Sequence, residues 1–390
     1  MPHILGAIFI AFVVYVGAAT IPETFAHISE FAKGAGISGT AEKIDDDYRD
    51  MLGFKSYNLQ NKGFYINLNG LAARAMGQRF MNNVVKLENG HLTLMGEEAD
   101  DAVLSAAASQ ITKLYGAQKG RGKEFVFVMT PNQIPKNADV VPKGYKDYSN
   151  QNADKLIEML AANGVPVIDL REELIKDGID NSDAYFVTDH HWKPETAFWA
   201  YTRIVDYFAG NGVIGEVPAE YTDLSCYDID VYEDWFLGSN GKRTGSYYAG
   251  VDDFSQIIPK FEAEISIEIP RIGLYKQGDF AEVAYDGSNL VLDYYIASMY
   301  SAYGYGERDR KFWRNENAAS DLRVLAIGDS NLNAPSVFFP LVFSEYDQLD
   351  MRMYKEDFKE YYSGYDPDVV ILLIAPSSID TKNVNYDFLG

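Results

Sequence analysis

The chain alternates between helical and extended hydrophobic patterns from about residue 98 onward. Apolar side chains recur at helical spacing over 101–118, and a second helix is expected at 152–163. Residues 125–129 form a continuous apolar run, which is typical of a strand buried on both faces, and 165–170 is a further short strand. Strand, helix and strand at this spacing predict a βαβ unit in a parallel sheet.

The same alternation returns near the C-terminus. Apolar runs at 322–327 and 369–375 predict two more buried strands. Between them we expect a helix over 334–343, a strand over 348–351 and a helix over 355–362. Because active sites of parallel sheets gather at the carboxyl ends of the strands, the loops after these strands are the first place to look for chemistry.

Two regions depart from this alternation. Residues 81–94 predict two short strands that turn at Asn89-Gly90, a favoured hairpin turn. Residues 210–320 are rich in Tyr, Asp and Gly and predict an irregular insertion with extended pieces at 263–269 and 289–295. Two interpretations of its tyrosines stay open: they are half-buried on irregular strands, or they form a surface that stacks against sugars.

The N-terminal segment is strongly apolar over residues 4–19. It is short for a membrane-spanning helix, which needs about 20 residues, but it has the length of a signal-peptide core. Val16-Gly17-Ala18 offers small side chains for a signal peptidase, although no Lys or Arg precedes Lys33. We therefore predict that residues 1–24 are a signal peptide or membrane anchor of an exported protein, with a buried N-terminal helix as the alternative.

Composition and charge narrow the possible partners. The 390 residues are 47% hydrophobic, which supports a folded core, and carry a formal net charge of −23. Nucleic acid is not expected as a partner, because phosphate binding needs clustered Lys and Arg. Cys226 is the sole cysteine of the sequence, so no disulfide can form within the chain.

The stretch from Tyr185 to Glu195 holds two of the five histidines, directly after an aspartate. In extended backbone an Asp-x-His spacing puts Asp189 and His191 on the same side of the chain. The carboxylate can then hold one imidazole nitrogen and leave the other free to act as a base. A metal-ligand pair or a buried polar cluster are the alternatives, although the remaining histidines stand in no ligand-like spacing.

Ser330 is the second candidate for chemistry. It follows Gly328-Asp329 at the point where a predicted buried strand turns into a helix. A serine there is exposed at the sheet edge, where backbone N–H groups and the helix dipole can stabilise an oxyanion. Ser, His and Asp form the same catalytic triad in any chain order, so Ser330 and the Asp-x-His loop predict a triad.

Several sequence blocks in this order resemble the DHHW-motif family, which is similar to the SGNH-hydrolase-like proteins that O-acetylate alginate and other exported polysaccharides. The blocks are YFVTDHHWKPETA (185–197), VLAIGDSN (324–331), DMR (350–352), 366–371, MTPN (129–132) and GSYYAGVDDF (245–254). The resemblance implies a three-layer, SGNH hydrolase-like (flavodoxin-like) α/β domain over 25–390, with a parallel sheet and the irregular insertion at 210–320.

The resemblance also implies a reaction. Ser330 would be the nucleophile, His191 the general base and Asp189 its orienting carboxylate. An acyl-serine intermediate would pass its acyl group, expected to be acetyl, to a hydroxyl of an exported or cell-envelope polysaccharide or to water. No metal and no organic cofactor are implied. A membrane-bound O-acyltransferase partner would supply the acyl groups of a transferase.

Three positions depart from the family pattern. Lys193 replaces a helix-capping Thr, Gln133 stands where a Lys is common, and Asn331 replaces an aromatic residue. Gln133 and Asn331, with the Tyr-rich insertion, favour the rival interpretation, a non-catalytic glycan-binding or assembly protein. The remaining candidates of the site are Asn132, Ser239 and Arg243 for the oxyanion or substrate, His190 as a hydrogen-bonded structural residue, and Trp192 as core packing.

Overall fold

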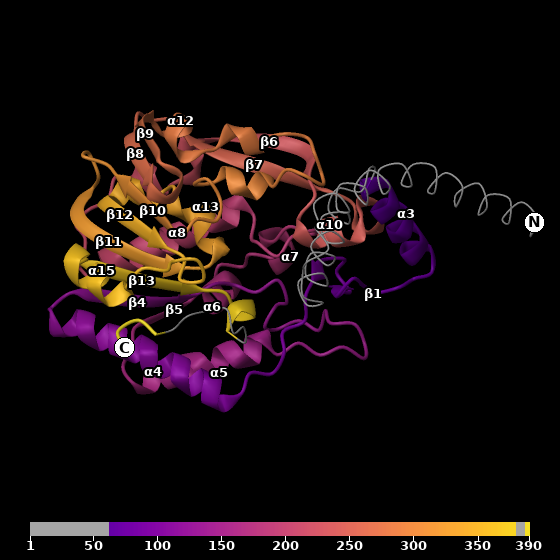
Figure 1. Cartoon of the computed structure of the whole chain (residues 1–390), viewed down its shortest axis with the longest axis horizontal. Coiled ribbons are helices and arrows are strands. Elements are labelled where there is room, and N and C mark those ends of the chain that lie inside the picture. Colours follow the sequence, from indigo (N-terminus) through magenta and orange to yellow (C-terminus); the bar gives the residue numbers. More distant parts are fainter. Residues whose placement is uncertain (1–61, 380–386) are drawn as a thin grey trace, which may run out of the picture. The chain divides into compact units, whose positions relative to one another are not determined.

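The computed structural model describes residues 62–379 and 387–390 (Figure 1). The chain divides into two compact units, Met1–Asn69 and Gly70–Gly390. Helix α3 (Lys62–Ala75) crosses the boundary between them. The predicted signal peptide or anchor at 1–24 lies outside the described residues. Within 62–379 and 387–390, no helix combines the length and the apolar character that crossing a membrane requires.

A mixed sheet forms the centre of the second unit, and over the described residues its strand order is β5-β4-β13-β11-β12-β10-β8-β9. The parallel strands are β5 (Val167–Asp169), β4 (Glu124–Met129), β13 (Val369–Ile374), β11 (Ser320–Gly328) and β12 (Phe343–Leu349). The antiparallel strands are β10 (Arg310–Arg314), β8 (Glu264–Ile269) and β9 (Leu274–Asp279). The predicted strands are therefore present, but the sheet is mixed rather than purely parallel, because the insertion contributes antiparallel strands at one edge.

Helices cover both faces of this sheet, which gives the predicted three layers. On β4, Val126 and Val128 belong to one apolar cluster, together with residues of α8 (Pro194–Gly210). Phe125, Phe127 and Met129 belong to the other cluster, with residues of α4 (Asp101–Gly120), α5 (Ser149–Ala162) and α15 (Phe358–Tyr365). Figure 1 shows α4 and α5 side by side on the same side of the sheet. Strands buried on both faces explain the continuous apolar runs in the sequence.

The predicted helix over 334–343 is wrong in its continuity. The chain instead forms η5 (Ser330–Leu332), α13 (Asn333–Ser336) and α14 (Phe339–Val342), and then enters β12 earlier than predicted. Pro340 has no N–H to donate to Ser336, and its ring crowds the carbonyl one turn earlier, which kinks or breaks a helix at this point.

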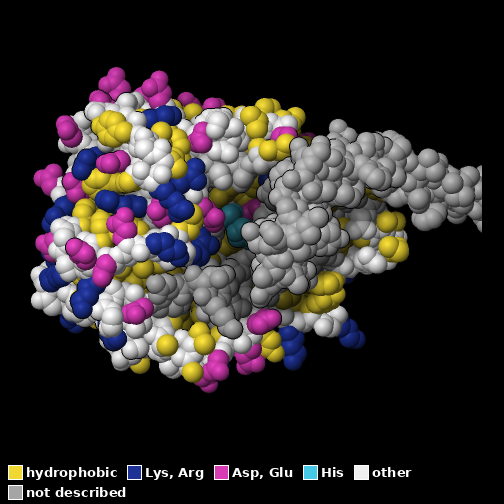
Figure 2. Space-filling model, viewed as in Figure 1, with side chains coloured by type: hydrophobic (Ala, Val, Ile, Leu, Met, Phe, Trp, Pro, Cys, Tyr) yellow, Lys and Arg dark blue, Asp and Glu magenta, His cyan; other side chains and the backbone are white. Residues whose placement is uncertain are grey.

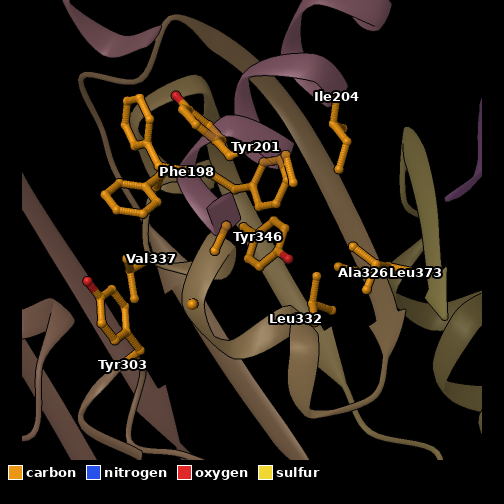
Figure 3. Packing of buried hydrophobic residues seen from close by; sticks show 14 of the residues in the cluster. Phe198, Tyr201, Ile204, Tyr303, Ala326, Leu332, Val337, Tyr346 and Leu373 are labelled. Carbon is orange, nitrogen blue, oxygen red and sulfur yellow. The ribbon is translucent and has the colours of Figure 1, made fainter. Parts of the chain in front are cut away.

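These short helical segments are nevertheless firmly packed. Figure 3 shows Leu332 and Val337 among the buried hydrophobic side chains, with Phe198 and Tyr201 of α8 and Tyr346 of β12. Leu332 and Val337 are fully buried. The segment that follows Ser330 is therefore anchored in the core, which limits how far the serine can move.

The insertion is more regular than predicted. Strands β6 (Tyr227–Phe236) and β7 (Asp252–Pro259) form an antiparallel ribbon, and α10 (Ser239–Thr244) and α11 (Ser246–Ala249) connect them. The extended piece at 263–269 is confirmed by β8. The one at 289–295 is wrong, because η3 (Gly287–Asn289) is followed by a turn in which the Asp293 carboxylate accepts the N–H groups of Tyr295 and Ile296. Several of its tyrosines are core residues: Tyr227, Tyr248, Tyr285, Tyr300 and Tyr303.

A small antiparallel sheet precedes α4 and contains β1 (Phe80–Met81), β2 (Val84–Lys86) and β3 (Leu92–Thr93). The predicted hairpin at Asn89-Gly90 is confirmed, with Gly90 at φ +95°. The remaining short helices are α6 (Leu170–Lys176), α7 (Asn181–Ala184), α9 (Ala219–Thr222), η1 (Leu224–Cys226), η2 (Pro270–Ile272), α12 (Phe280–Ala284), η4 (Met299–Ala302) and η6 (Pro376–Ser378).

Candidate active site

Ser330 lies at the carboxyl end of β11, where the turn is held by its neighbour Asp329. One oxygen of the Asp329 carboxylate accepts the Asn331 N–H and the Asn331 side-chain amide, both at 2.9 Å. The other oxygen accepts the Ala375 N–H at 3.1 Å and the Ser378 hydroxyl at 2.8 Å. Asp329 therefore ties the serine turn to the end of β13. It also explains Asn331, whose side chain supports this turn.

Asp189 and His191 lie in a bent loop closed by a bridge between Tyr185 and Trp192. The expected extended backbone is wrong here. Asp189 Oδ1 instead accepts the backbone N–H of His191 at 3.0 Å and lies 2.5 Å from His191 Nδ1. The aspartate thus folds the loop back on itself and holds the imidazole with the same oxygen.

The other imidazole nitrogen faces the serine. His191 Nε2 lies 2.8 Å from Ser330 Oγ. Asp189, His191 and Ser330 are all buried, with at most 8% of each residue exposed. The structure therefore brings the three predicted residues into one hydrogen-bonded chain from carboxylate to hydroxyl.

Hydrogen bonds around Asp189 favour its ionised form. The N–H of Ser239 lies 2.5 Å from Asp189 Oδ2 and donates to it. Burial of Asp189 opposes its ionisation, but His190, His191 and this N–H outweigh the effect of burial and hold the pKa of Asp189 well below its usual value. Gly238 leaves the necessary space, since a Cβ there would lie 2.2 Å from the Asp189 Cβ. A glycine at 238 is thus required by the close approach of the two segments.

Two buried side chains hold the loop from beneath. The Gln133 amide donates to the carbonyls of Phe186 and Asp189, both at 3.0 Å. The Asp252 carboxylate accepts the N–H groups of Val187 and Thr188, both at 2.8 Å, and burial raises the pKa of Asp252. Gln133 therefore has a structural role that explains its place beside the motif. Asp252 belongs to the block GSYYAGVDDF (245–254), but the sequence did not indicate that its carboxylate supports this loop.

Aromatic rings surround the imidazole. Tyr300 stacks on His191 with ring centres 3.9 Å apart and an interplanar angle of 14°. Trp192 is fully buried, and its indole N–H donates to the Asn331 carbonyl at 3.2 Å, which confirms Trp192 as core packing. His190 lies with its ring centre 3.8 Å from that of His191, and its Nδ1 is 2.9 Å from Ser239 Oγ. The His190 side chain is 45% exposed and therefore lies at the surface of the site.

A cavity of about 430 Å³ opens over this hydrogen-bonded chain. The cavity is lined by the three hydrogen-bonded residues and by further side chains, which include Ser239, Lys242, Tyr300, Arg308 and Asn333. Burial lowers the pKa of Lys242, whose ammonium donates to the Ala297 carbonyl at 2.5 Å. On the face shown in Figure 2, a small area of histidine surface lies among charged and hydrophobic side chains.

Of the three residues predicted for the oxyanion or substrate, the structure places one at the cavity and two elsewhere. Ser239 lines the cavity, and its N–H and hydroxyl contact Asp189 and His190. Asn132 instead lines another cavity, of about 220 Å³. Arg243 is exposed, and its carbonyl accepts the Asn82 amide at 2.7 Å. The structure therefore does not bring Asn132 or Arg243 to Ser330.

The lining residues that the sequence did not predict include Asn333, Tyr300 and Lys242. Asn333 stood three positions after the serine, so one turn of helix was a usable signal. Tyr300 lay unrecognised among the many tyrosines of the insertion, and Lys242 directly precedes the chosen Arg243.

Asp189, His190 and His191 also meet the distance requirement for a metal site, since one potential ligand atom of each lies within 4.8 Å of the others. These atoms are already engaged, because His191 Nδ1 contacts Asp189 and His190 Nδ1 contacts Ser239. A metal ion bound there would have to replace these hydrogen bonds. The arrangement therefore fits proton transfer along the chain better than metal ligation.

Comparisons with known proteins agree with the observed fold. Residues 93–223 match the family model of the SGNH hydrolase-like domain of acetyltransferase AlgX. PatB1 of Bacillus cereus superposes with a TM-score of 0.65 at 21% identity over 78% of this chain and 99% of that chain. The structure of PatB1 with a sulfonyl adduct superposes with a TM-score of 0.64 at 18% identity, and the match covers 79% of this chain and 100% of that chain. A DHHW family protein from Eubacterium siraeum DSM 15702 superposes with a TM-score of 0.58 at 20% identity, and the match covers 80% of this chain and 97% of that chain.

Comparison with curated proteins finds no match. At the identities of the solved structures, the likeness establishes the fold alone. The predicted SGNH hydrolase-like α/β fold is therefore confirmed, and the family match covers the Asp-x-His loop within 93–223.

Proposed function

We propose that this protein is a serine-dependent O-acyltransferase or esterase, with acetyl as the acyl group and an exported or cell-envelope polysaccharide as the substrate. The observation that carries the proposal is the hydrogen-bonded chain Asp189–His191–Ser330 beneath an open cavity. The family match to an acetyltransferase domain and the fold shared with PatB1 and a DHHW family protein support it.

The first half of the reaction forms an acyl-serine. His191 Nε2 takes the proton of Ser330 Oγ as the oxygen attacks the acyl carbonyl of the donor. Asp189, held ionised by its hydrogen bonds, stabilises the imidazolium that forms. The tetrahedral intermediate then collapses, the donor oxygen leaves with the proton from His191, and the acyl group stays on Ser330.

The second half transfers the acyl group. A hydroxyl of the acceptor approaches through the cavity, gives its proton to His191 Nε2 and attacks the acyl-serine carbonyl. Collapse returns the proton to Ser330 Oγ and releases the new ester, or the free carboxylic acid when the acceptor is water. With a sugar hydroxyl as acceptor the protein is a transferase, and with water it is an esterase. All groups needed for proton transfer belong to this chain.

The setting of the reaction is part of the same proposal. The apolar segment over residues 4–19 supports export, and a membrane-bound O-acyltransferase would deliver acyl groups to Ser330. The rival function, glycan binding without catalysis, rested partly on Gln133 and Asn331. Both side chains have structural hydrogen bonds close to the motif, so their departure from the family pattern does not argue against catalysis.

The test compares wild type with Ser330→Ala on a chromogenic acetyl ester and on a serine-reactive fluorophosphonate. We expect turnover and labelling in wild type and loss of both in Ser330→Ala. Adding an oligosaccharide acceptor then distinguishes transfer, seen as an acetylated sugar by mass spectrometry, from hydrolysis. Unchanged turnover in Ser330→Ala would refute the triad, whereas binding of acetylated glycan without labelling of wild type would support the rival function.

A further inference from the structure

Asn333 lines the same cavity as Ser330, and its carboxamide oxygen has two donors. Lys311 Nζ donates to Asn333 Oδ1 at 2.7 Å, and Gln348 Nε2 donates to the same oxygen at 3.2 Å. Two donors can face only the oxygen end of an amide, so these bonds fix which end is which. The Nδ2 end, with its two N–H groups, is left to face away from Lys311 and Gln348.

The backbone places Asn333 close to the serine. Ser330 begins η5 and Asn333 begins α13, so the two residues are three positions apart in one helical turn. Side chains at i and i+3 of a 3₁₀ turn lie above one another on the same face. Ser330, His191 and Asn333 all line one cavity, so the free Nδ2 end of the Asn333 amide can serve an acyl group that enters this cavity.

Burial of the Lys311 side chain, which holds the Asn333 amide, costs free energy of folding. The side chain is fully buried, and within residues 62–379 and 387–390 its ammonium has no carboxylate in ion-pair contact. Its other partner is the Gly306 carbonyl at 3.2 Å. Burial lowers the pKa of Lys311 to about 7, with Arg308 adding to the effect, while Asp350 and Glu307 oppose it. Ammonium and neutral amine both carry N–H groups, so either form keeps the bond to Asn333.

A lysine buried without a carboxylate partner destabilises a fold, so its presence here calls for a function that offsets this cost. An apolar side chain of similar length would fill the same space at lower cost. Such departures from the best choice for stability are expected at functional sites. The use visible here is the orientation of Asn333, since the other hydrogen bond of the Lys311 ammonium within the described part of the chain goes to the Gly306 carbonyl.

We infer that Asn333 is a further catalytic residue whose Nδ2 donates a hydrogen bond to the acyl carbonyl oxygen as it becomes an oxyanion, and that Lys311 and Gln348 are positioning residues for it. The inference rests on the proposed acyl transfer through Ser330. The attack on the carbonyl turns the C=O double bond into a C–O⁻ single bond, and a fixed N–H donor stabilises that charge.

The decisive variant is Asn333→Asp, measured beside Asn333→Ala with a chromogenic acetyl ester. Asp keeps the acceptor for Lys311 and Gln348, so the local structure is retained, but it has no N–H to donate. We expect kcat to fall by about 100- to 1,000-fold in both variants with a much smaller change in KM. Lys311→Met should lower kcat by up to about 100-fold, since the amide loses its fixed orientation.

Asn315→Ala is the matched control, because it also removes a buried amide. The Asn315 amide donates to the Pro340 carbonyl at 2.9 Å and does not line the cavity. It should retain wild-type kcat. The rate of Ser330 labelling by a fluorophosphonate, whose P=O oxygen needs the same donor, should fall in Asn333→Asp as kcat does. Wild-type kcat in Asn333→Asp, with Ser330→Ala inactive, would overturn this inference and leave the proposed function standing. An active Ser330→Ala would overturn both.

Discussion

His191 Nε2 lies 2.8 Å from Ser330 Oγ, although 139 positions separate the two residues in the chain. The topology of the sheet creates this contact. Ser330 follows β11, which pairs with a parallel strand on each side, and the Asp189–His191 loop leads directly into α8, which packs on one face of the parallel strands. The carboxyl edge of the sheet is thus the place where residues from distant blocks can form one site.

The two adjacent histidines should differ sharply in their contribution. Since His191 contacts both Asp189 and Ser330, His191→Ala should lower kcat on an acetyl ester by about a million-fold, the size of loss that removal of a triad histidine causes. His190→Ala should lower it by less than the roughly 100-fold that loss of a proton-transfer group costs. The measurement is kcat for both variants. Equal losses would show that His190 takes part in proton transfer, and the single-base mechanism would have to be abandoned.

The strands and the core of the site were predictable from the sequence for physical reasons. Strands covered on both faces must be apolar throughout, and such runs at 125–129, 322–327 and 369–375 appear as β4, β11 and β13. That Asp189, His191 and Ser330 lie together was predictable because Ser, His and Asp recur in hydrogen-bonded triads and because each stood beside a predicted strand or helix end.

Other features depended on tertiary contacts that local patterns do not encode. The antiparallel strands β8 to β10 lie within the Tyr-rich insertion, and only pairing with β12 shows that they extend the main sheet. The Asp-x-His pair was predicted for the wrong reason, since a side-chain-to-backbone hydrogen bond of Asp189 makes the turn. Nothing near Lys311 in the sequence indicated that its side chain reaches Asn333.

Gly238→Ala tests the packing around the carboxylate. The added methyl group would meet the Asp189 Cβ at 2.2 Å, so one of the two segments must shift. Because Asp189 holds His191 by a 2.5 Å contact, we expect kcat to fall by about 100-fold, the size of effect that a misplacement of about 1 Å causes. Gly215→Ala is the control: position 215 is exposed, has space for a Cβ, and should retain full activity. Full activity of Gly238→Ala would show that the loop tolerates the shift.

The ring of Tyr300 should contribute to catalysis through its stacked face. When His191 accepts the serine proton it becomes a cation, and an aromatic face at 3.9 Å stabilises a desolvated cation by up to about 2 kcal/mol. Tyr300→Leu should therefore lower kcat by about 10- to 30-fold, the factor that this energy gives at about 1.4 kcal/mol per tenfold. Tyr300→Phe keeps the ring and should stay close to wild type. If Phe and Leu reduce kcat equally, the hydroxyl rather than the ring face carries the effect.

Lys311 should make stability rise with pH above neutrality. Burial lowers the pKa of Lys311 from 10.5 to about 7 in the folded protein. Between these values the unfolded chain binds one proton more than the folded chain, so the free energy of unfolding increases with pH by up to about 1.4 kcal/mol per unit. Below pH 7 the lysine is protonated in both states and this slope vanishes.

Lys311→Met lacks the ionisable group and therefore lacks this increase. Urea unfolding of both proteins at pH 6.5, 8 and 9.5 should show a gain of about 3 kcal/mol for wild type relative to Lys311→Met across the range. Other titrating groups contribute equally to both proteins and cancel in the difference. Parallel pH profiles would show that the Lys311 ammonium keeps its proton in the folded state, as it would if water reached it.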